Sequence, residues 1–371
     1  MTELATKPDS QEWMTLLSRL LLVPRDGDHS SPSKIEALNS DVRSISREEF
    51  DDLLTLASSN HVVVRGLEAF LDITCEAKDY IRAEWAITAI ASERARIETA
   101  LTYLHDICTA IENERYSVAV IKSLDHWPDV GSDLDLYTNA DSGGISKLLE
   151  ERFHAQIAPP SWGDRLARKW NFLIPGLPEA VEIHMGRLGQ TGEQVAIASR
   201  LVERSRWVLI GDVSFRVPSV SDRLMISTLQ RMYRHFYFRL CDIVDTAALF
   251  ETGDIDFQDL RSSASAAGIW EGVATYLAIV SDYVRQYRGF GLELPKFVIA
   301  SARFGGSEIY YGRGFLRVPI MPQSARLYGK QLAGLLWKRE LHNGARLSLL
   351  PWLATAAAVG QKITGSDKGI W

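Results

Sequence analysis

The residues with the clearest chemical potential are two carboxylates spaced two positions apart, Asp133 and Asp135, in the segment 131–137 (GSDLDLY). The segment is typical of a β-strand, where side chains alternate between faces, so both carboxylates point to one face and the leucines between them point to the core. Two carboxylates held side by side repel each other, and a divalent cation neutralises them. Oxygen ligands of this kind favour Mg²⁺, which keeps positions open for substrate phosphates.

A second alternating segment, 181–185 (VEIHM), follows some fifty residues later. It places Glu182 and His184 on one face of a strand and three apolar side chains on the other. A third carboxylate on a neighbouring strand would complete a site for one or two metal ions, formed by Asp133, Asp135 and Glu182. Such sites serve phosphoryl or nucleotidyl transfer. His184 could touch the metal or substrate, or it could be a structural histidine.

The order and spacing of these segments resemble the DNA polymerase β-type nucleotidyltransferase superfamily, and within it the uncharacterised bacterial nucleotidyltransferase family. The pattern of that family runs Leu-Lys-Gly, a short loop, Ser-Asp-x-Asp-Leu, and then a Val-Asp-x-His strand. The matching segments here are 121–123 (IKS), 132–136 (SDLDL) and 181–184 (VEIH). The resemblance covers about residues 85–250, less than half of the chain.

The resemblance implies a Mg²⁺-dependent nucleotidyltransferase that moves a nucleoside monophosphate from an NTP, with ATP the first choice, to a hydroxyl or similar acceptor on a small molecule, peptide or protein. Asp133 and Asp135 would hold the metal that binds the NTP phosphates, and Glu182 would complete a second metal site or act as a base. Nucleotide-binding roles fall to the polar residues around the strand ends. They are Lys122, Ser123 and Ser132.

Two departures from the superfamily pattern support an alternative. A Gly-Ser pair usually ends the first strand and holds nucleotide phosphates, whereas this chain has Lys122 and Ser123 there. The third carboxylate is Glu182, where Asp is commoner. The alternative function is a non-catalytic scaffold of this fold that binds a ligand or a protein partner. Lys122 and Ser123 could equally be an ordinary polar strand end, and Ser132 could simply cap a turn.

Composition limits the other possibilities. The chain has 371 residues with 41 basic and 47 acidic side chains, a net charge of −6, which argues against a nucleic-acid partner. The three cysteines lack metal-binding spacing and are expected to be buried, inert thiols in a reducing compartment, and the eight histidines show no zinc spacing. No apolar run is long enough to span a bilayer, and no signal peptide is expected, so we expect a cytoplasmic protein with no membrane partner.

The periodicity predicts an α+β fold with a small mixed sheet flanked by helical regions. The expected division is an N-terminal helical region (1–114), a nucleotidyltransferase-like α/β core (115–218) and a mostly helical C-terminal region (219–371). We expect helices at 10–22, from Arg47 behind a Ser46–Glu49 capping box, and at 77–113, with a loop at 24–45. We expect a mixed sheet of four to six strands within residues 116–218, from segments near 117–121, 131–137, 170–174 and 180–185 and a further strand pair at 206–210 and 213–217.

Basic residues provide two further candidates near the core. Arg165, Arg168 and Lys169 precede a strand and could meet phosphate, although such runs are usually solvated. The segment 219–250 is expected to be one helix whose face at Arg231, Arg234 and His235 could line a cleft, or whose Arg239 could pair with Asp242. Two closing helices are expected at 322–338 and 345–363.

Overall fold

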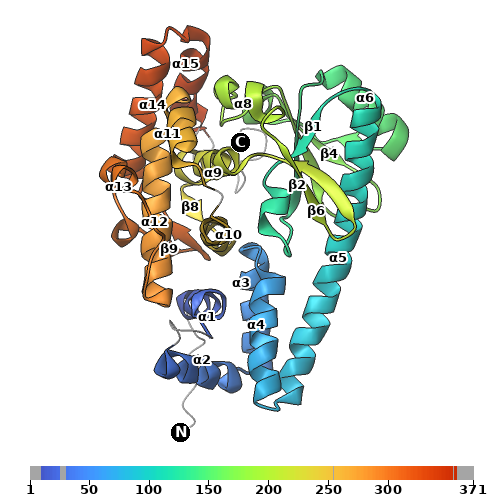
Figure 1. Cartoon of the computed structure of the whole chain (residues 1–371). Coiled ribbons are helices and arrows are strands. Elements are labelled where there is room, and N and C mark those ends of the chain that lie inside the picture. Colours follow the sequence, from blue (N-terminus) through green and yellow to red (C-terminus); the bar gives the residue numbers. More distant parts are fainter. Residues whose placement is uncertain (1–9, 26–30, 254, 354, 357–371) are drawn as a thin grey trace.

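The computed structural model describes residues 10–25, 31–253, 255–353 and 355–356. It confirms an α+β fold in which helices at both ends of the chain surround a small mixed sheet (Figure 1). None of the helices in the part of the chain described has both the length and the apolar character needed to cross a membrane.

Four helices open the chain. They are α1 (Ser10–Leu22), α2 (Pro32–Ser44), α3 (Arg47–Ser59) and α4 (Val63–Glu76). The capping box at the start of α3 is as expected, since the Ser46 hydroxyl accepts from the Glu49 amide and the Glu49 carboxylate accepts from the Ser46 amide. The predicted loop at 24–45 was wrong from Pro32 onward, because proline fits the first turn of a helix, where no donor is lost, and Leu38 and Val42 are buried.

The predicted long helix is α5 (Tyr80–Asn113), about 50 Å long at 1.5 Å per residue. It runs from the N-terminal helices to the sheet (Figure 1). Ile97, Leu104 and Ile111 are buried along its second half, while Glu98 and Glu112 are exposed, as the apolar periodicity predicts. Arg96 on α5 donates to the carbonyl oxygens of Val130 and Gly131, so the helix also holds the loop before the next strand.

The sheet has the strand order β1-β2-β5-β4-β3, with β2 and β5 parallel and the other neighbours antiparallel. Its strands are β1 (Val118–Val120), β2 (Asp133–Thr138), β3 (Gln156–Ile157), β4 (Lys169–Leu173) and β5 (Ala180–Met185). A separate ribbon of β6 (Arg206–Ile210) and β7 (Val213–Val217) packs beside β1. Between the strands lie η1 (Ser123–His126), α6 (Ser142–Phe153), α7 (Trp162–Ala167) and α8 (Val195–Leu201).

The two faces of the sheet differ in chemistry. Leu134 and Leu136 on β2, with Val181 and Ile183 on β5, pack into one core with the second half of α5 and with α6. The alternate residues face the C-terminal helices, where Tyr137 joins a second core. The polar residues of β2 and β5 therefore lie between the sheet and the C-terminal part of the chain.

The C-terminal part is mostly helical, with one small sheet of order β8-β10-β9. Its first elements are α9 (Val220–Thr228), η2 (Leu229–His235), β8 (Tyr237–Phe238), α10 (Leu240–Glu251), α11 (Phe257–Ala266) and α12 (Trp270–Arg288). The remaining ones are α13 (Lys296–Ser301), η3 (Gly306–Glu308), β9 (Tyr310–Gly312), β10 (Phe315–Arg317), η4 (Ile320–Ser324), α14 (Ala325–Trp337) and α15 (Leu341–Ser348). The helix expected at 345–363 runs beyond the described residues.

The prediction of a single helix over 219–250 was wrong. The π-helical turn η2 follows α9, and Phe236 then takes a left-handed conformation (φ 54°), which ends the helix and starts β8. The ion pair expected for Arg239 is made by Arg231 instead, whose Nε lies 2.7 Å from Asp242 Oδ2, while the Arg239 backbone amide donates to that carboxylate.

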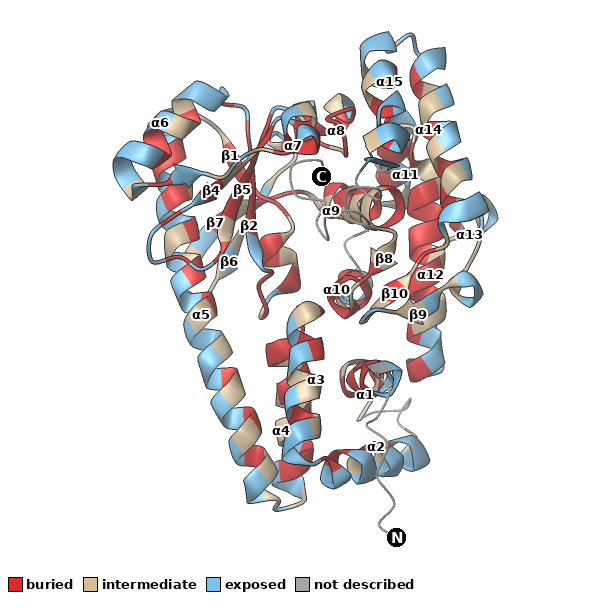
Figure 2. Ribbon diagram, turned by 180° about the vertical axis from the view of Figure 1, so that it is seen from behind, coloured by how far each residue is buried: buried red, intermediate tan, exposed pale blue. Residues whose placement is uncertain are grey.

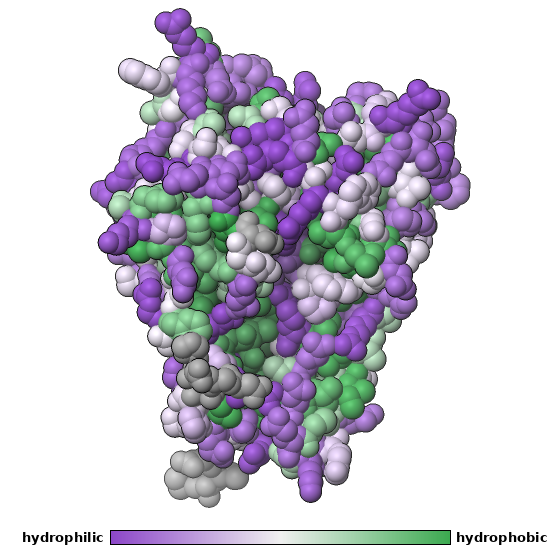
Figure 3. All heavy atoms as spheres, in the orientation of Figure 1, coloured by the Kyte–Doolittle hydropathy of each residue, from purple (hydrophilic) through white to green (hydrophobic). Residues whose placement is uncertain are grey.

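Two large apolar cores, neither contiguous in sequence, hold the described part of the molecule together, and a third, small one joins α14 to α15. One large core joins α1–α4 and the first half of α5 to α8–α12, and the other joins the second half of α5 to the sheet, α6 and β7. Buried residues line the inward sides of α3, α4, α10 and α12 in Figure 2, and hydrophilic side chains cover much of the outer face in Figure 3. Of the three cysteines expected to be buried, Cys241 is, whereas Cys75 is exposed and Cys108 is half-buried.

Candidate functional site

The register of β2 and β5 brings the predicted carboxylates together. Asp135 is the direct partner of Glu182 in the parallel ladder, and Asp133 lies two residues earlier on the same strand and therefore on the same face. His184 is the next residue along that face of β5 and pairs with Lys169 of β4. The alternation seen in the sequence thus produces a polar face of the sheet that carries all three carboxylates.

Glu182 is tied to three neighbours. Its Oε2 lies 2.8 Å from Lys169 Nζ, and its Oε1 lies 2.9 Å from His184 Nε2 and 3.4 Å from Lys122 Nζ. Although burial works against ionisation, the two lysines hold the pKa of Glu182 well below its usual range. Burial also lowers the pKa of His184 to about 4, so its ring is neutral near pH 7.

Lys169 was part of a basic run that the sequence could not distinguish from a solvated face. It is instead buried, and it bridges Glu182 to Asp164, whose Oδ1 is 3.0 Å from its Nζ. Arg165 and Arg168 are not part of this cluster. The signal for a buried Lys169 was its place in a strand. Lys169 and Asn171 alternate on one face of β4, and both pair with residues of β5.

Asp135 is paired with Lys122, whose Nζ bridges it to Glu182. Burial, reinforced by the charge of Glu182, still raises the pKa of Asp135 to about 7 despite that lysine. Adjacent buried carboxylates behave in this way, with one acid strengthened and the other weakened. The ammonium of Lys122 therefore occupies the position between two carboxylates where a cation is expected.

The backbone of Lys122 is strained. Its φ and ψ are 63° and −55°, and the Ser123 amide donates to the Ile121 carbonyl at 2.7 Å, which makes a γ-turn centred on the lysine. Turns of this hand are rare and costly for a residue with a side chain. The turn reverses the chain after β1 and directs Lys122 back over the sheet.

The two candidate serines have different surroundings. Ser123 is buried, and its hydroxyl accepts from the Asp135 amide at 2.7 Å and donates to the Asp133 carbonyl at 3.1 Å, so it fixes the start of β2. Ser132 is exposed at the mouth of the site. Asp133 is also more exposed than the other two acids, although burial of its carboxyl group and the charge of Glu182 raise its pKa.

A cavity of about 130 Å³ lies over these residues and is lined by Asp133, Asp135 and Glu182 together with Lys122, both serines and, from η2 and β8, a set of basic and aromatic groups. Arg231 is neutralised by Asp242, but Arg234 and Arg239 have no carboxylate partner among the described residues. Tyr237 contributes a ring that stacks on Phe315 with a centroid separation of 4.4 Å. The cavity therefore has an anionic floor and a cationic wall.

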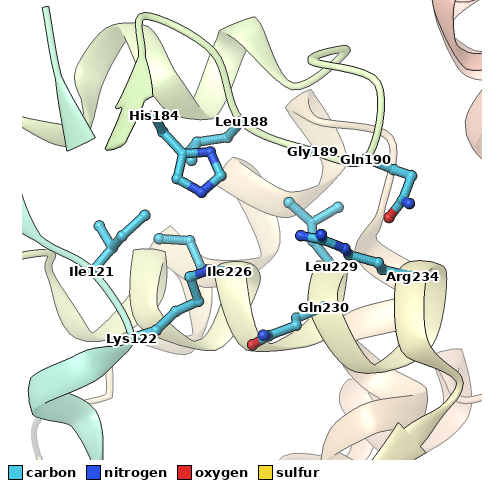
Figure 4. A pocket seen from close by; sticks show the side chains of 10 residues that line it. All are labelled: Ile121, Lys122, His184, Leu188, Gly189, Gln190, Ile226, Leu229, Gln230 and Arg234. Atoms are coloured by element: carbon cyan, nitrogen blue, oxygen red, sulfur yellow. The ribbon is translucent and has the colours of Figure 1, made fainter. Parts of the chain in front are cut away.

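A second, smaller cavity of about 40 Å³ adjoins the first, because Lys122, Gln230 and Arg234 line both. Figure 4 shows Ile121, Ile226 and Leu229 around its apolar part, with His184 and Arg234 on opposite sides. Its character is mainly apolar with polar groups at the rim. The pair of cavities thus offers a charged compartment beside an apolar one.

Two sets of side chains in the described part of the chain are close enough to hold a metal ion. In one set the ligand atoms of Asp135, Glu182 and His184 lie within 4.8 Å of one another, and in the other those of His61, His126 and Cys241 do. Asp133 is not part of the first set. The second set was missed by the sequence, because its members come from three distant segments with no recognisable spacing.

Comparison of the sequence with models of known protein families, and with characterised proteins, finds no match.

Proposed function

We propose that the cavity over β2 and β5 is a Mg²⁺-dependent nucleotidyl-transfer site. The observation that carries the proposal is the parallel register that sets Asp135 beside Glu182, with Asp133 on the same face of the sheet. Paired carboxylates on one face of a sheet, next to a cavity, suit divalent-metal chemistry on phosphates.

The opposite wall supports the same proposal. Arg234 and Arg239 place guanidinium groups without carboxylate partners in the described structure above the acidic floor. Guanidinium groups bind phosphate oxygens through pairs of hydrogen bonds. We assign the charged cavity to the phosphates of an NTP such as ATP, and the adjoining apolar cavity to its base or to the acceptor.

The donor set fits Mg²⁺, since carboxylate oxygens of Asp133 and Asp135 face the cavity. Glu182 can join them only when Lys122 withdraws, because the lysine now bridges Asp135 and Glu182. Bound there, Mg²⁺ would neutralise charge on the phosphates. Lys122 and Ser132 are then free to donate to phosphate oxygens, whereas Ser123 acts by holding β2 in place.

In the proposed reaction the acceptor hydroxyl oxygen bonds to the α-phosphorus, the bond to the β-phosphate oxygen breaks, and pyrophosphate leaves. The hydroxyl proton must go to a base. Glu182 is the acid left for this role while Asp133 and Asp135 hold the metal, and withdrawal of Lys122 would make it a stronger base, because that lysine helps to hold its pKa low. The charge of the chain argues against a nucleic-acid acceptor and leaves a small molecule, peptide or protein.

A second function is favoured by one observation. Lys122 stands at a strained turn where the superfamily usually has glycine, and its ammonium already neutralises Asp135 and Glu182. A carboxylate pair with a built-in counter-ion does not require a metal. The alternative is a non-catalytic scaffold that binds a ligand or protein partner without Mg²⁺.

The deciding experiment measures melting temperature with each NTP, with and without Mg²⁺, followed by incubation with labelled NTP and cell extract and mass spectrometry of labelled products. Transfer that requires Mg²⁺ and disappears in Asp135→Asn is expected. Asp106→Asn, at an exposed position on α5, is the matched control and should behave like wild type. Nucleotide binding that ignores Mg²⁺, with no labelled product, would support the scaffold instead.

A further inference from the structure

A cluster of one thiol and two imidazoles lies at the edge of the charged cavity and takes no part in the function proposed above. Its members are His61 just after α3, His126 at the end of η1 and Cys241 near the start of α10. They are separated by 65 and 115 residues in the chain, so only the folded structure brings them together.

The backbone that brings them together is tightly fixed. Asn60 joins the end of α3 to the start of α10, because its side-chain oxygen accepts from the Leu240 amide at 3.0 Å and its carbonyl accepts from the Cys241 amide at 3.3 Å. The side-chain amide of Asn60 also donates to the Gly314 carbonyl at 3.1 Å. The bonds of Asn60 to Leu240 and Cys241 hold the end of α3 against the start of α10, so His61 and Cys241 lie close together.

His126 is oriented by a second layer of charges. Its Nδ1 lies 2.5 Å from Asp245, one helical turn beyond Cys241, and Arg65 donates to Asp245 at 2.6 Å and to Asp129 at 2.9 Å. Because a carboxylate accepts, Nδ1 donates to Asp245, and Nε2 is the ring nitrogen that faces the thiol. A carboxylate that fixes the outer nitrogen of an imidazole is the usual support of a metal-binding histidine.

The spacing fits a metal ion. Cys241 Sγ is 3.8 Å from His126 Nε2, and the ligand atoms of all three residues lie within 4.8 Å of one another. A tetrahedral zinc ion with bonds of about 2.3 Å to sulfur and about 2.0 Å to nitrogen would set sulfur and nitrogen about 3.5 Å apart. His61 Nδ1 provides independent support, because it is buried and has no hydrogen bond to any residue that the structure describes.

From these contacts we propose that His61, His126 and Cys241 bind a divalent cation of the zinc type. Two imidazoles and a thiolate are the ligands that Zn²⁺ prefers, and oxygen-seeking Mg²⁺ is a poor match for them. Both histidines line the charged cavity, whereas Cys241 does not, so the fourth coordination position opens toward that cavity. Water or a substrate oxygen fills it.

The surrounding charges both oppose and support the ion. Arg231 and Arg239 lie near His61 and disfavour a cation, while Asp242 and Asp245 lie near Cys241 and favour one. The thiolate formed on binding supplies a further negative charge, so zinc adds only one net positive charge to the site.

Cys241, His126 and Asp245 are in contact in the order of a thiol–imidazole–carboxylate catalytic triad. The thiol, however, is not placed for nucleophilic attack. Cys241 is completely buried and takes no part in lining the cavity, so a substrate there has no path to its sulfur. A nucleophile must reach the substrate, whereas a metal ligand needs only to reach the metal.

The test is a titration of the chelator-treated full-length chain with Co²⁺ and Zn²⁺. The thiolate-to-cobalt absorption should saturate at one equivalent of Co²⁺, and Zn²⁺ should abolish it by displacement. The absorption should be lost in Cys241→Ser and kept in Cys108→Ser, a matched thiol on α5. It should also be kept in Asp135→Asn, which separates this site from the carboxylate cluster.

Two further variants keep the proposal testable if Cys241→Ser fails to fold. His61→Ala, at a half-buried position, should weaken Co²⁺ binding at least tenfold. Asp245→Asn should weaken it by about 10- to 100-fold while the thiolate absorption remains, as expected of a positioning residue. Absence of thiolate absorption in the native chain, its survival in Cys241→Ser, or unchanged affinity in His61→Ala would each overturn the proposal.

Discussion

The two clusters that meet at the cavity differ in where their balancing charges lie. Asp135 and Glu182 are neutralised from within, by the ammonium groups of Lys122 and Lys169. The cluster around His126 is balanced one layer further out, by the Asp245–Arg65–Asp129 network. A metal can therefore bridge Asp135 and Glu182 only in exchange for Lys122, whereas the second cluster has only protons to lose.

The largest expected effect comes from removing the outer layer of the second cluster. Arg65→Met leaves Asp129 and Asp245 buried without their counter-ion, and we expect a loss of about 3–5 kcal/mol in the free energy of unfolding. Denaturant unfolding measures it. The control is Arg47→Met, whose exposed pair with Asp51 should contribute less than about 1 kcal/mol. A loss of unfolding free energy in Arg65→Met as small as that expected of the control would show that the network contributes little to stability.

Asp135→Asn tests the raised pKa of Asp135 through the pH dependence of the free energy of unfolding. The pKa of Asp135 is raised from 3.8 to about 7, so between these values the folded chain binds more protons at this site than the unfolded chain does. This contribution to stability is present at low pH and is lost as pH rises toward and through 7. The variant should gain stability relative to wild type between pH 4 and 8, on the order of a few kcal/mol. A constant difference across that range would contradict the raised pKa.

Lys122→Gly and Lys122→Met separate strain from charge at the γ-turn. Both remove the ammonium, but only glycine takes a positive φ without strain, so the glycine variant should be more stable than the methionine variant by about 1–3 kcal/mol. If the lysine occupies the position of a metal, Mg²⁺ should raise the melting temperature of both variants more than that of wild type. An identical change in melting temperature with Mg²⁺ in all three proteins would show that Lys122 does not compete with Mg²⁺ for the site.

The smallest effects distinguish the two serines. Ser123→Ala loses both bonds to β2 and should cost about 1–2 kcal/mol, whereas Ser132→Ala, at an exposed position, should stay within about 0.5 kcal/mol of wild type. If Ser132 donates to phosphate, its variant should instead weaken NTP binding. Thermal unfolding and nucleotide titration of both variants decide between these roles.

The carboxylate cluster could be predicted because its geometry is local. Alternation within 131–137 and 181–185 fixes which side chains share a face, and only the pairing of the two strands had to be supplied by the fold. The partners of that cluster were harder to predict. Lys169 belongs to a basic run that has the composition of a solvated surface, and only its place in β4 shows that it is buried.

Other features depend on tertiary contacts that no short segment encodes. Helix α2 begins in a segment rich in Ser and Pro that resembles a loop, and it is stabilised by burying Leu38 and Val42. The break at Phe236 lies inside a sequence with helical periodicity, because the following residues pair with β10 instead. The grouping of His61, His126 and Cys241 requires α3, η1 and α10 to be placed first.

The packing of α1 on α12 has a consequence for how the chain is made. The Ser18 hydroxyl lies 2.6 Å from the hydroxyl of Tyr283, 265 residues later, in the core shared by the two ends of the chain. A ribosome adding about 5–20 residues per second needs roughly tens of seconds to produce that partner. During this time α1–α4 can pack on one another and on α5, but the part of α1 that contacts α12 stays uncovered. The contact of α1 with α12 is thus one of the last parts of the N-terminal region to become native.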